Sequence, residues 1–121
     1  MTTRRSLHLK PIHIFEDMYG VNFYISYGVP YDTHKRAVKK YIDIEIGESH
    51  GDGKVSGFQK DGEILYWIWT SSKNKALLVH EITHAVICCL KDRGFTCSTD
   101  SDEAYAYLAQ YLFRKITSFR R

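Results

Sequence analysis

Residues 80–84, His-Glu-Ile-Thr-His, constrain this chain more than any other stretch, because they place three chemically demanding side chains inside an apolar run. The run from Ala76 to Leu90 is almost wholly apolar around them, which is typical of a helix packed on a core. On a helix, residues four apart lie on one face, so His80 and His84 can direct two imidazole nitrogens to one metal ion at about 2.0–2.1 Å. Glu81 is rotated by about 100° from His80, beside such an ion but outside its ligand set. The stretch therefore predicts a helix that carries a metal site.

The alternative interpretation is a core helix whose two histidines are satisfied by neighbouring groups. We consider it less favourable, because burying two histidines and a glutamate without a shared ligand is costly. A chain of 121 residues can bury a core without metal support, so the ion is expected to be functional. A divalent metal lowers the pKa of a bound water to about 7, and a nearby carboxylate can take its proton during attack on a carbonyl. We therefore predict zinc hydrolase chemistry with Glu81 as general base.

A catalytic zinc needs a third protein ligand, and Glu103 is our candidate. It opens a second predicted helix that a short loop folds back against the first. One face of that helix carries Glu103, Tyr107 and Gln110 and lies opposite its apolar stripe. This face can be directed toward the metal. Alternatively, Glu103 only caps its helix and favours the helix dipole. Asp102 is the fallback ligand.

The remaining histidines and cysteines carry weaker signals. His50 lies in a polar, glycine-rich loop over residues 48–54, where it either borders an active site or is a plain surface residue. Cys97 could in principle ligate zinc, but Glu103 is preferred. The chain has three cysteines, an odd number, and the neighbours Cys88 and Cys89 cannot easily pair. Such usage fits a reducing cytoplasm.

Composition and charge limit the classes of binding partner to be expected. The net charge is +3, and basic residues gather at 35–40 and 114–121. We interpret both groups as solvated helix faces and a charged tail, because no aromatic residues or binding motif accompany them, so a nucleic-acid partner is not expected. No stretch reaches the length of a membrane span, and no apolar segment follows the basic N-terminus, so neither a membrane partner nor export by a signal peptide is expected.

The length predicts a single domain over residues 1–121, with residues 1–5 disordered, and the strand and helix patterns predict the α+β class. Alternating or β-branched runs predict strands, and the densest of them, 64–70, is expected to be the strongest. Capping residues and 3.6-residue periodicity predict three helices, the metal-motif helix starting at Ser71 or Ser72 and ending at Gly94. The expected elements are strands near 11–15, 21–27, 41–46 and 63–70, and helices over 32–41, over the metal motif, and from a capping box at Asp100 to about 119.

Residues 79–86, Val-His-Glu-Ile-Thr-His-Ala-Val, followed by residues 102–108, Asp-Glu-Ala-Tyr-Ala-Tyr-Leu, resemble the zincin metallopeptidases. Among these they are similar to minimal gluzincin-like proteins, in which a glutamate on a second helix completes the site. The resemblance implies a minimal zincin core: a small mixed or mostly antiparallel sheet packed on a backing helix, the metal-motif helix and a C-terminal glutamate helix. It also implies that strand 63–69 lines the cleft and binds an extended substrate by edge pairing.

The pattern departs from the gluzincins at one position. Many of them carry Glu-x-x-x-Asp, in which the aspartate orients a zinc-bound histidine. In this chain Tyr107 stands at that position, where its phenol could orient His80 or His84 or donate to a developing oxyanion. Packing explains a helical tyrosine equally well.

Two functions follow from these expectations. The first is a small cytoplasmic zinc peptidase that acts on a peptide or protein segment. The second follows from a similarity to small zincin-like proteins of tailed phages and prophages. It is a metal-bound scaffold without peptidase activity, either a virion or assembly component that contacts phage structural proteins or a host-directed inhibitor. Its expected location is the bacterial cytoplasm or the virion.

Overall fold

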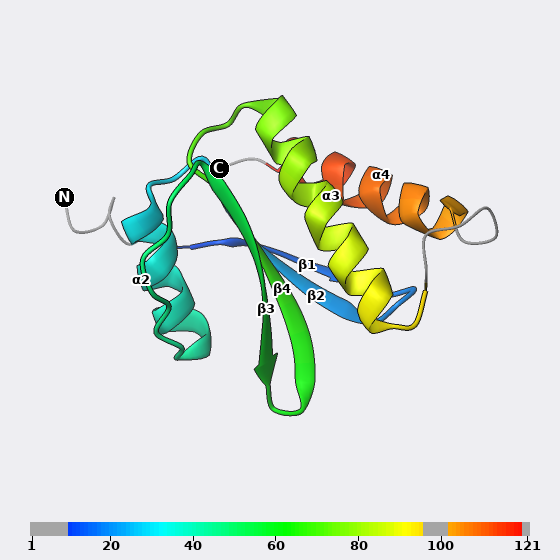
Figure 1. The fold of residues 1–121 in the computed structure, drawn as a ribbon, viewed down its shortest axis with the longest axis horizontal. Helices are drawn as coiled ribbons and strands as arrows, with labels where there is room; N and C mark the ends of the chain where they lie inside the picture. The colour runs from blue at the N-terminus through cyan, green and yellow to red at the C-terminus, as the bar shows by residue number, and fades with distance from the viewer. Residues whose placement is uncertain (1–9, 96–101, 120–121) are drawn as a thin grey trace.

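The computed structural model describes residues 10–95 and 102–119, in which three helices pack on a mixed four-stranded sheet (Figure 1). The protein is therefore α+β with a mixed sheet, as predicted. Strands β1 and β2 form an antiparallel hairpin, β2 and β4 are parallel, and β3 and β4 are antiparallel, which gives the order β1-β2-β4-β3. The elements are β1 (Ile12–Glu16), β2 (Val21–Tyr27), α2 (Tyr31–Ile42), β3 (Gly53–Lys60), β4 (Glu63–Thr70), α3 (Lys75–Asp92) and α4 (Asp102–Ser118).

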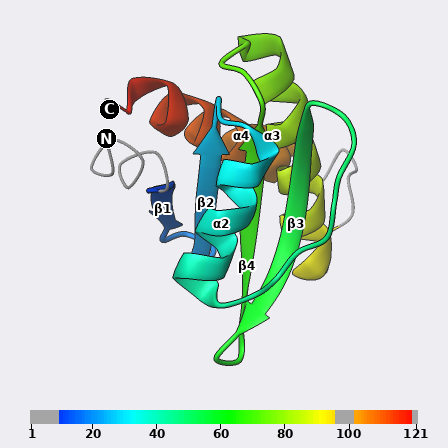
Figure 2. The same ribbon diagram turned by 90° about the vertical axis from the view of Figure 1, so that its left-hand side faces the viewer.

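Helices cover both faces of the sheet. Helix α2 lies over one face, across β2 and β4, while α3 and α4 lie over the other (Figures 1 and 2). Because side chains alternate along a strand, β4 supplies both cores. Leu65 and Trp67 pack with α2, whereas Tyr66 and Ile68 belong to the larger cluster with α3 and α4. This double burial explains why residues 65–70 are all buried and why 65–69 form one continuous apolar run rather than an alternating pattern.

Several predicted elements are confirmed. The two N-terminal strands, the helix near 32–41 and the strand near 63–70 are present within a residue or two of the expected bounds. Gly20 has a φ of +68° in the β1–β2 turn, and Gly94 has a φ of +87° just after α3, both in the left-handed region that glycine favours. The capping box at Asp100 and the N-terminal residues 1–5 lie outside the described residues.

Three local predictions are wrong. Residues 41–46 form no strand, because Tyr41 and Ile42 are the last two residues of α2 and residues 43–46 are irregular. The chain leaves α2 through a left-handed Asp43, and Ile44 and Ile46 pack against the α2-side core without a strand partner. The α3 N-cap is Asn74, whose side-chain oxygen accepts a hydrogen bond from the Leu77 amide at 3.1 Å, and not Ser71 or Ser72.

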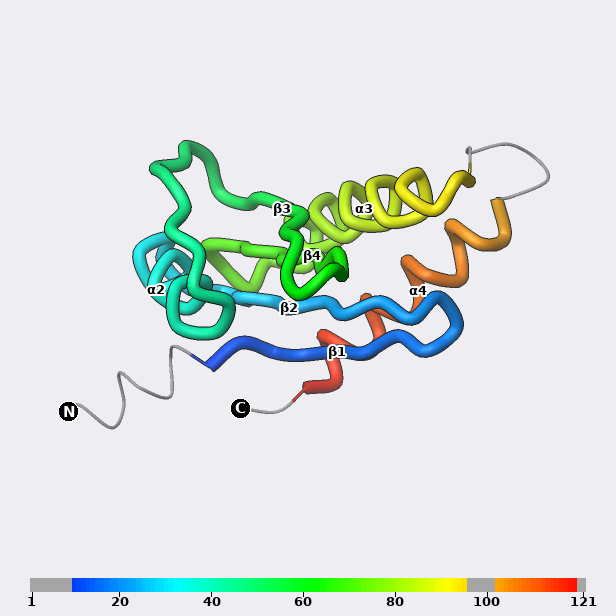
Figure 3. Tube along the Cα trace, turned by 90° about the horizontal axis from the view of Figure 1, so that it is seen from below, coloured from blue at the N-terminus to red at the C-terminus, as the bar shows by residue number. Residues whose placement is uncertain are grey.

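The third incorrect prediction is that strand 63–69 provides an open sheet edge. Strand β4 is interior, paired with β3 over Glu63–Thr70 and with β2 over Leu65–Thr70, so over those residues it has no open edge for a substrate strand. The sequence had not predicted β3, whose glycines and lysines give little strand signal. Strand β3 occupies the edge that β4 was expected to provide, and it contacts α3 directly. In the view of Figure 3, the β3 end of the sheet and α3 lie on the same side of the molecule.

Candidate metal centre

The two histidines of the motif converge as the helical spacing predicted. His80 and His84 lie on the exposed side of α3, with their Nε2 atoms 3.2 Å apart. Two nitrogens at 2.0–2.1 Å from one tetrahedral ion are separated by about 3.3 Å. The pair therefore fits two positions of a zinc site. The same distance also allows a single N–H···N hydrogen bond between the rings, with the tautomer deciding which ring donates.

Glu81 lies between the histidine pair and the sheet. It is only 6% exposed, although both histidines beside it are exposed. Burial raises the pKa of its carboxyl above the usual range, while charge on His80 or His84 would lower it. No group among residues 10–95 and 102–119 donates a hydrogen bond to its carboxylate. With respect to this part of the chain, its oxygens can accept a proton or a hydrogen bond from a ligand.

Glu103 is not gathered with the histidines. It is exposed in the first turn of α4, next to Asp102, which is also exposed. Across residues 10–95 and 102–119, no three His, Cys, Asp or Glu side chains form a group that could hold a metal ion. The structure therefore brings together two of the expected ligands. The assignment of Glu103 as the third stays a prediction, with Asp102 as its fallback.

Tyr107 has a clear partner that sequence reasoning missed. Its hydroxyl donates a hydrogen bond to Glu16 Oε2 at 3.0 Å, and burial together with this carboxylate raises the pKa of the phenol. Glu16 is fully buried and also accepts from the backbone amides of Met18 and Tyr19, at 3.1 and 2.8 Å. Tyr107 thus ties α4 to the β1–β2 turn. The sequence signal that could have revealed the Glu16 side of this contact is a glutamate at the end of a strand, just before a glycine-containing turn.

The other residues singled out by the sequence do not join the histidine pair. His50 is exposed in the loop before β3, and Cys97 lies outside the described residues. Cys88 is exposed and Cys89 is buried, and both are free thiols. Burial raises the pKa of the Cys89 thiol to about 11, so it is not a thiolate nucleophile near neutral pH.

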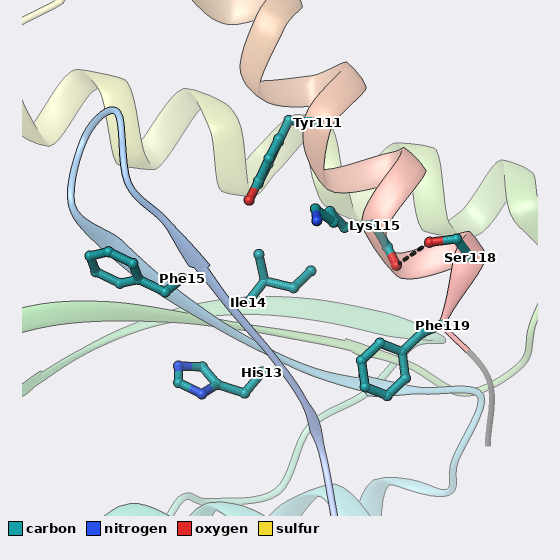
Figure 4. Close-up of a pocket in the computed structure, with 7 residues that line it drawn as sticks. All are labelled: His13, Ile14, Phe15, Tyr111, Lys115, Ser118 and Phe119. Carbon is teal, nitrogen blue, oxygen red and sulfur yellow. Dashed lines mark hydrogen bonds between the residues drawn. The ribbon is translucent and has the colours of Figure 1, made fainter.

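A cavity of about 450 Å³ lies elsewhere, between β1 and the C-terminal end of α4 (Figure 4). Phe15, Tyr111 and Phe119 supply aromatic walls, and Lys115 also lines it. Both phenylalanines are about half exposed, at 53% for Phe15 and 50% for Phe119. The cavity contains none of the motif residues, so the histidine pair and this cavity are separate features of the surface.

No family model, curated protein or solved structure was found to match the chain. Among the described residues, none of the helices is both long and apolar enough to cross a membrane.

Proposed function

We propose that this protein is a zinc-dependent metallopeptidase of the zincin type, in which His80 and His84 bind the metal and Glu81 is the general base. The observation that supports this most directly is the convergence of the two Nε2 atoms at 3.2 Å. Beside them lies a buried carboxylate to which no described group donates a hydrogen bond. A simple pair of structural histidines would not require such a neighbour.

A bound zinc ion would act as a Lewis acid and would lower the pKa of a coordinated water toward 7. The residues of this chain then have separate tasks. His80 and His84 would hold the ion through their Nε2 atoms, which requires that each ring carry its proton on Nδ1. The Glu81 carboxylate accepts the proton of the attacking water and returns it to the leaving amine.

We assign the third ligand to Glu103. Its position in the first turn of α4 leaves its side chain exposed, without a competing partner in the core. Tyr107 is then best described as a support of the β1–β2 turn, because its hydroxyl is already bound to Glu16.

The substrate is a peptide or protein segment. The free edge nearest the motif belongs to β3, whose first residue, Gly53, abuts Glu81. An extended peptide can pair with such an edge through main-chain hydrogen bonds. Because the histidines are exposed on a small domain, we expect selective cleavage of one partner rather than general digestion. Broad, unselective cleavage of a panel of proteins would contradict this expectation.

The test begins with the metal content of the purified full chain, measured by mass spectrometry. The wild type should carry close to one zinc, His84→Ala and Glu103→Ala should lose it, and His50→Ala serves as a matched exposed-histidine control that keeps it. If zinc stays bound in Glu103→Ala, the third ligand is misassigned. If the wild type binds no zinc under metal-replete conditions, the peptidase proposal fails.

A metal-bound interaction protein is the second candidate, as a phage scaffold, an assembly component or a host-directed inhibitor. The half-exposed Phe15 and Phe119 beside the cavity favour it, because exposed apolar clusters commonly mark protein contacts. Stoichiometric zinc without hydrolysis of any peptide in a diverse library would move this candidate ahead.

A further inference from the structure

Gly53 lies directly against the carboxylate of Glu81. It is the first residue of β3 and pairs with Thr70 of β4. A Cβ atom built on Gly53 would lie 2.6 Å from Glu81 Oε2 and 2.8 Å from both its Cδ and its Cγ. Real Cβ atoms essentially never approach other heavy atoms so closely. Gly53 does not have a positive φ, so the position needs glycine for space and not for backbone conformation.

The clash would not be relieved by a small movement of the side-chain tip. It includes Cγ, so the outer half of the Glu81 side chain would have to leave its place, and Glu81 is a buried residue. Gly57, four residues along the same strand, shows the contrast. A Cβ there would meet only the Tyr66 ring, at 3.6 Å, which is an ordinary van der Waals contact.

We propose that Gly53 is a positioning residue that fixes the Glu81 carboxylate beside His80 and His84. The inference rests on the proposed function for its catalytic meaning. No described group donates a hydrogen bond to this carboxylate, so among these residues the close contact with β3 is what restricts its place: the backbone of β3 forms one wall, and only hydrogen at position 53 leaves room. A methyl group there displaces the carboxylate, while the two histidines, on the exposed side of α3, keep their geometry.

The contact is tested by a double-mutant cycle of thermal unfolding on the full chain, using Gly53→Ala, Glu81→Ala and the double variant. Alanine normally stabilises a position whose backbone it can adopt, since it restricts the unfolded chain. We expect Gly53→Ala to lower Tm by about 5 °C in the wild type, as overpacking does, and to leave it unchanged or raise it in Glu81→Ala. Gly57→Ala is the control and should give the same shift in both backgrounds.

Equal shifts for Gly53→Ala in the two backgrounds would overturn the proposal. If Gly53→Ala alone does not fold, recovery of folding by Glu81→Ala is the expected result, and an unfolded double variant overturns it.

The catalytic role is tested by zinc content and kinetics. Gly53→Ala should retain zinc and lower kcat by about tenfold or more, with complete loss of general base catalysis, about 10²–10⁴-fold, as the upper limit, and with little change in KM. An unchanged kcat would overturn the positioning role. A wild type that binds zinc but hydrolyses nothing would refute the peptidase instead, and the stability cycle would still decide whether Gly53 fixes Glu81.

Discussion

Acid should destabilise this protein through one buried histidine on the opposite face of the sheet. His34 of α2 is 1% exposed, and its Nδ1 lies 3.0 Å from the Ser26 hydroxyl, which also accepts a hydrogen bond from Trp67 Nε1 at 2.8 Å. The ring meets Trp67 edge-on, with centroids 5.8 Å apart, and stacks on Trp69, with centroids 6.0 Å apart. Burial, and to a smaller extent the charge of Lys54, lowers the pKa of His34 from 6.5 to about 4.

The direction follows from proton linkage. Between pH 6.5 and 4 the unfolded chain binds a proton on His34 that the folded chain does not, so unfolding takes up a proton and the free energy of unfolding falls as pH falls. Above pH 6.5 this contribution to stability is complete. A difference of roughly 2.5 units at 1.36 kcal/mol per unit gives a loss of about 3 kcal/mol by pH 4. For a chain of this size that corresponds to a Tm shift of about 10 °C.

The assay is urea unfolding at a series of pH values from 7.5 to 4, comparing the wild type with His34→Gln. Glutamine keeps a polar group near Ser26 but does not titrate, so its profile should be flatter than that of the wild type by up to about 3 kcal/mol. Subtracting the two profiles removes the contribution of the carboxylates, which titrate in both. His50→Gln, at an exposed loop position, should retain the wild-type slope. Parallel profiles for the wild type and His34→Gln would refute the reasoning.

Three further outcomes are expected. Glu81→Gln should keep zinc and lower peptide hydrolysis by about 10²–10⁴, and full activity would remove Glu81 from the mechanism. Tyr107→Phe should lower the free energy of unfolding by about 1–2 kcal/mol, because the hydrogen bond to Glu16 is lost, and should leave kcat unchanged. A fall in kcat at unchanged stability would instead show that the phenol donates a hydrogen bond to the oxyanion. Asn74→Ala should cost about 1 kcal/mol in chemical denaturation, and Ser72→Ala almost nothing, which would separate the observed cap from the expected one.

The predictions made from the sequence are correct where the cause of the structure lies in neighbouring residues. The convergence of His80 and His84 depends only on the four-residue spacing along a helix. The turn at Gly20 and the end of α3 at Gly94 depend on a backbone conformation that glycine adopts readily. These features need no knowledge of what packs around them.

The incorrect predictions share another physical reason. Residues 43–46 alternate like a strand, but alternation indicates only that one face is buried, and Ile44 and Ile46 bury theirs against the α2-side core without pairing. Strand β3 shows the reverse, because pairing with β4 makes a strand of a sequence with little intrinsic preference.

The sequence by itself determined the metal-motif helix, the pairing of its two histidines and the α+β class, because helical spacing and apolar periodicity are properties of neighbouring residues. Tertiary structure alone decided what surrounds them. It placed Gly53 against Glu81 and Glu16 beneath Tyr107, and it made β3 the sheet edge beside α3. These contacts join segments far apart in the chain, and a local pattern can state that a face is buried without stating which segment covers it.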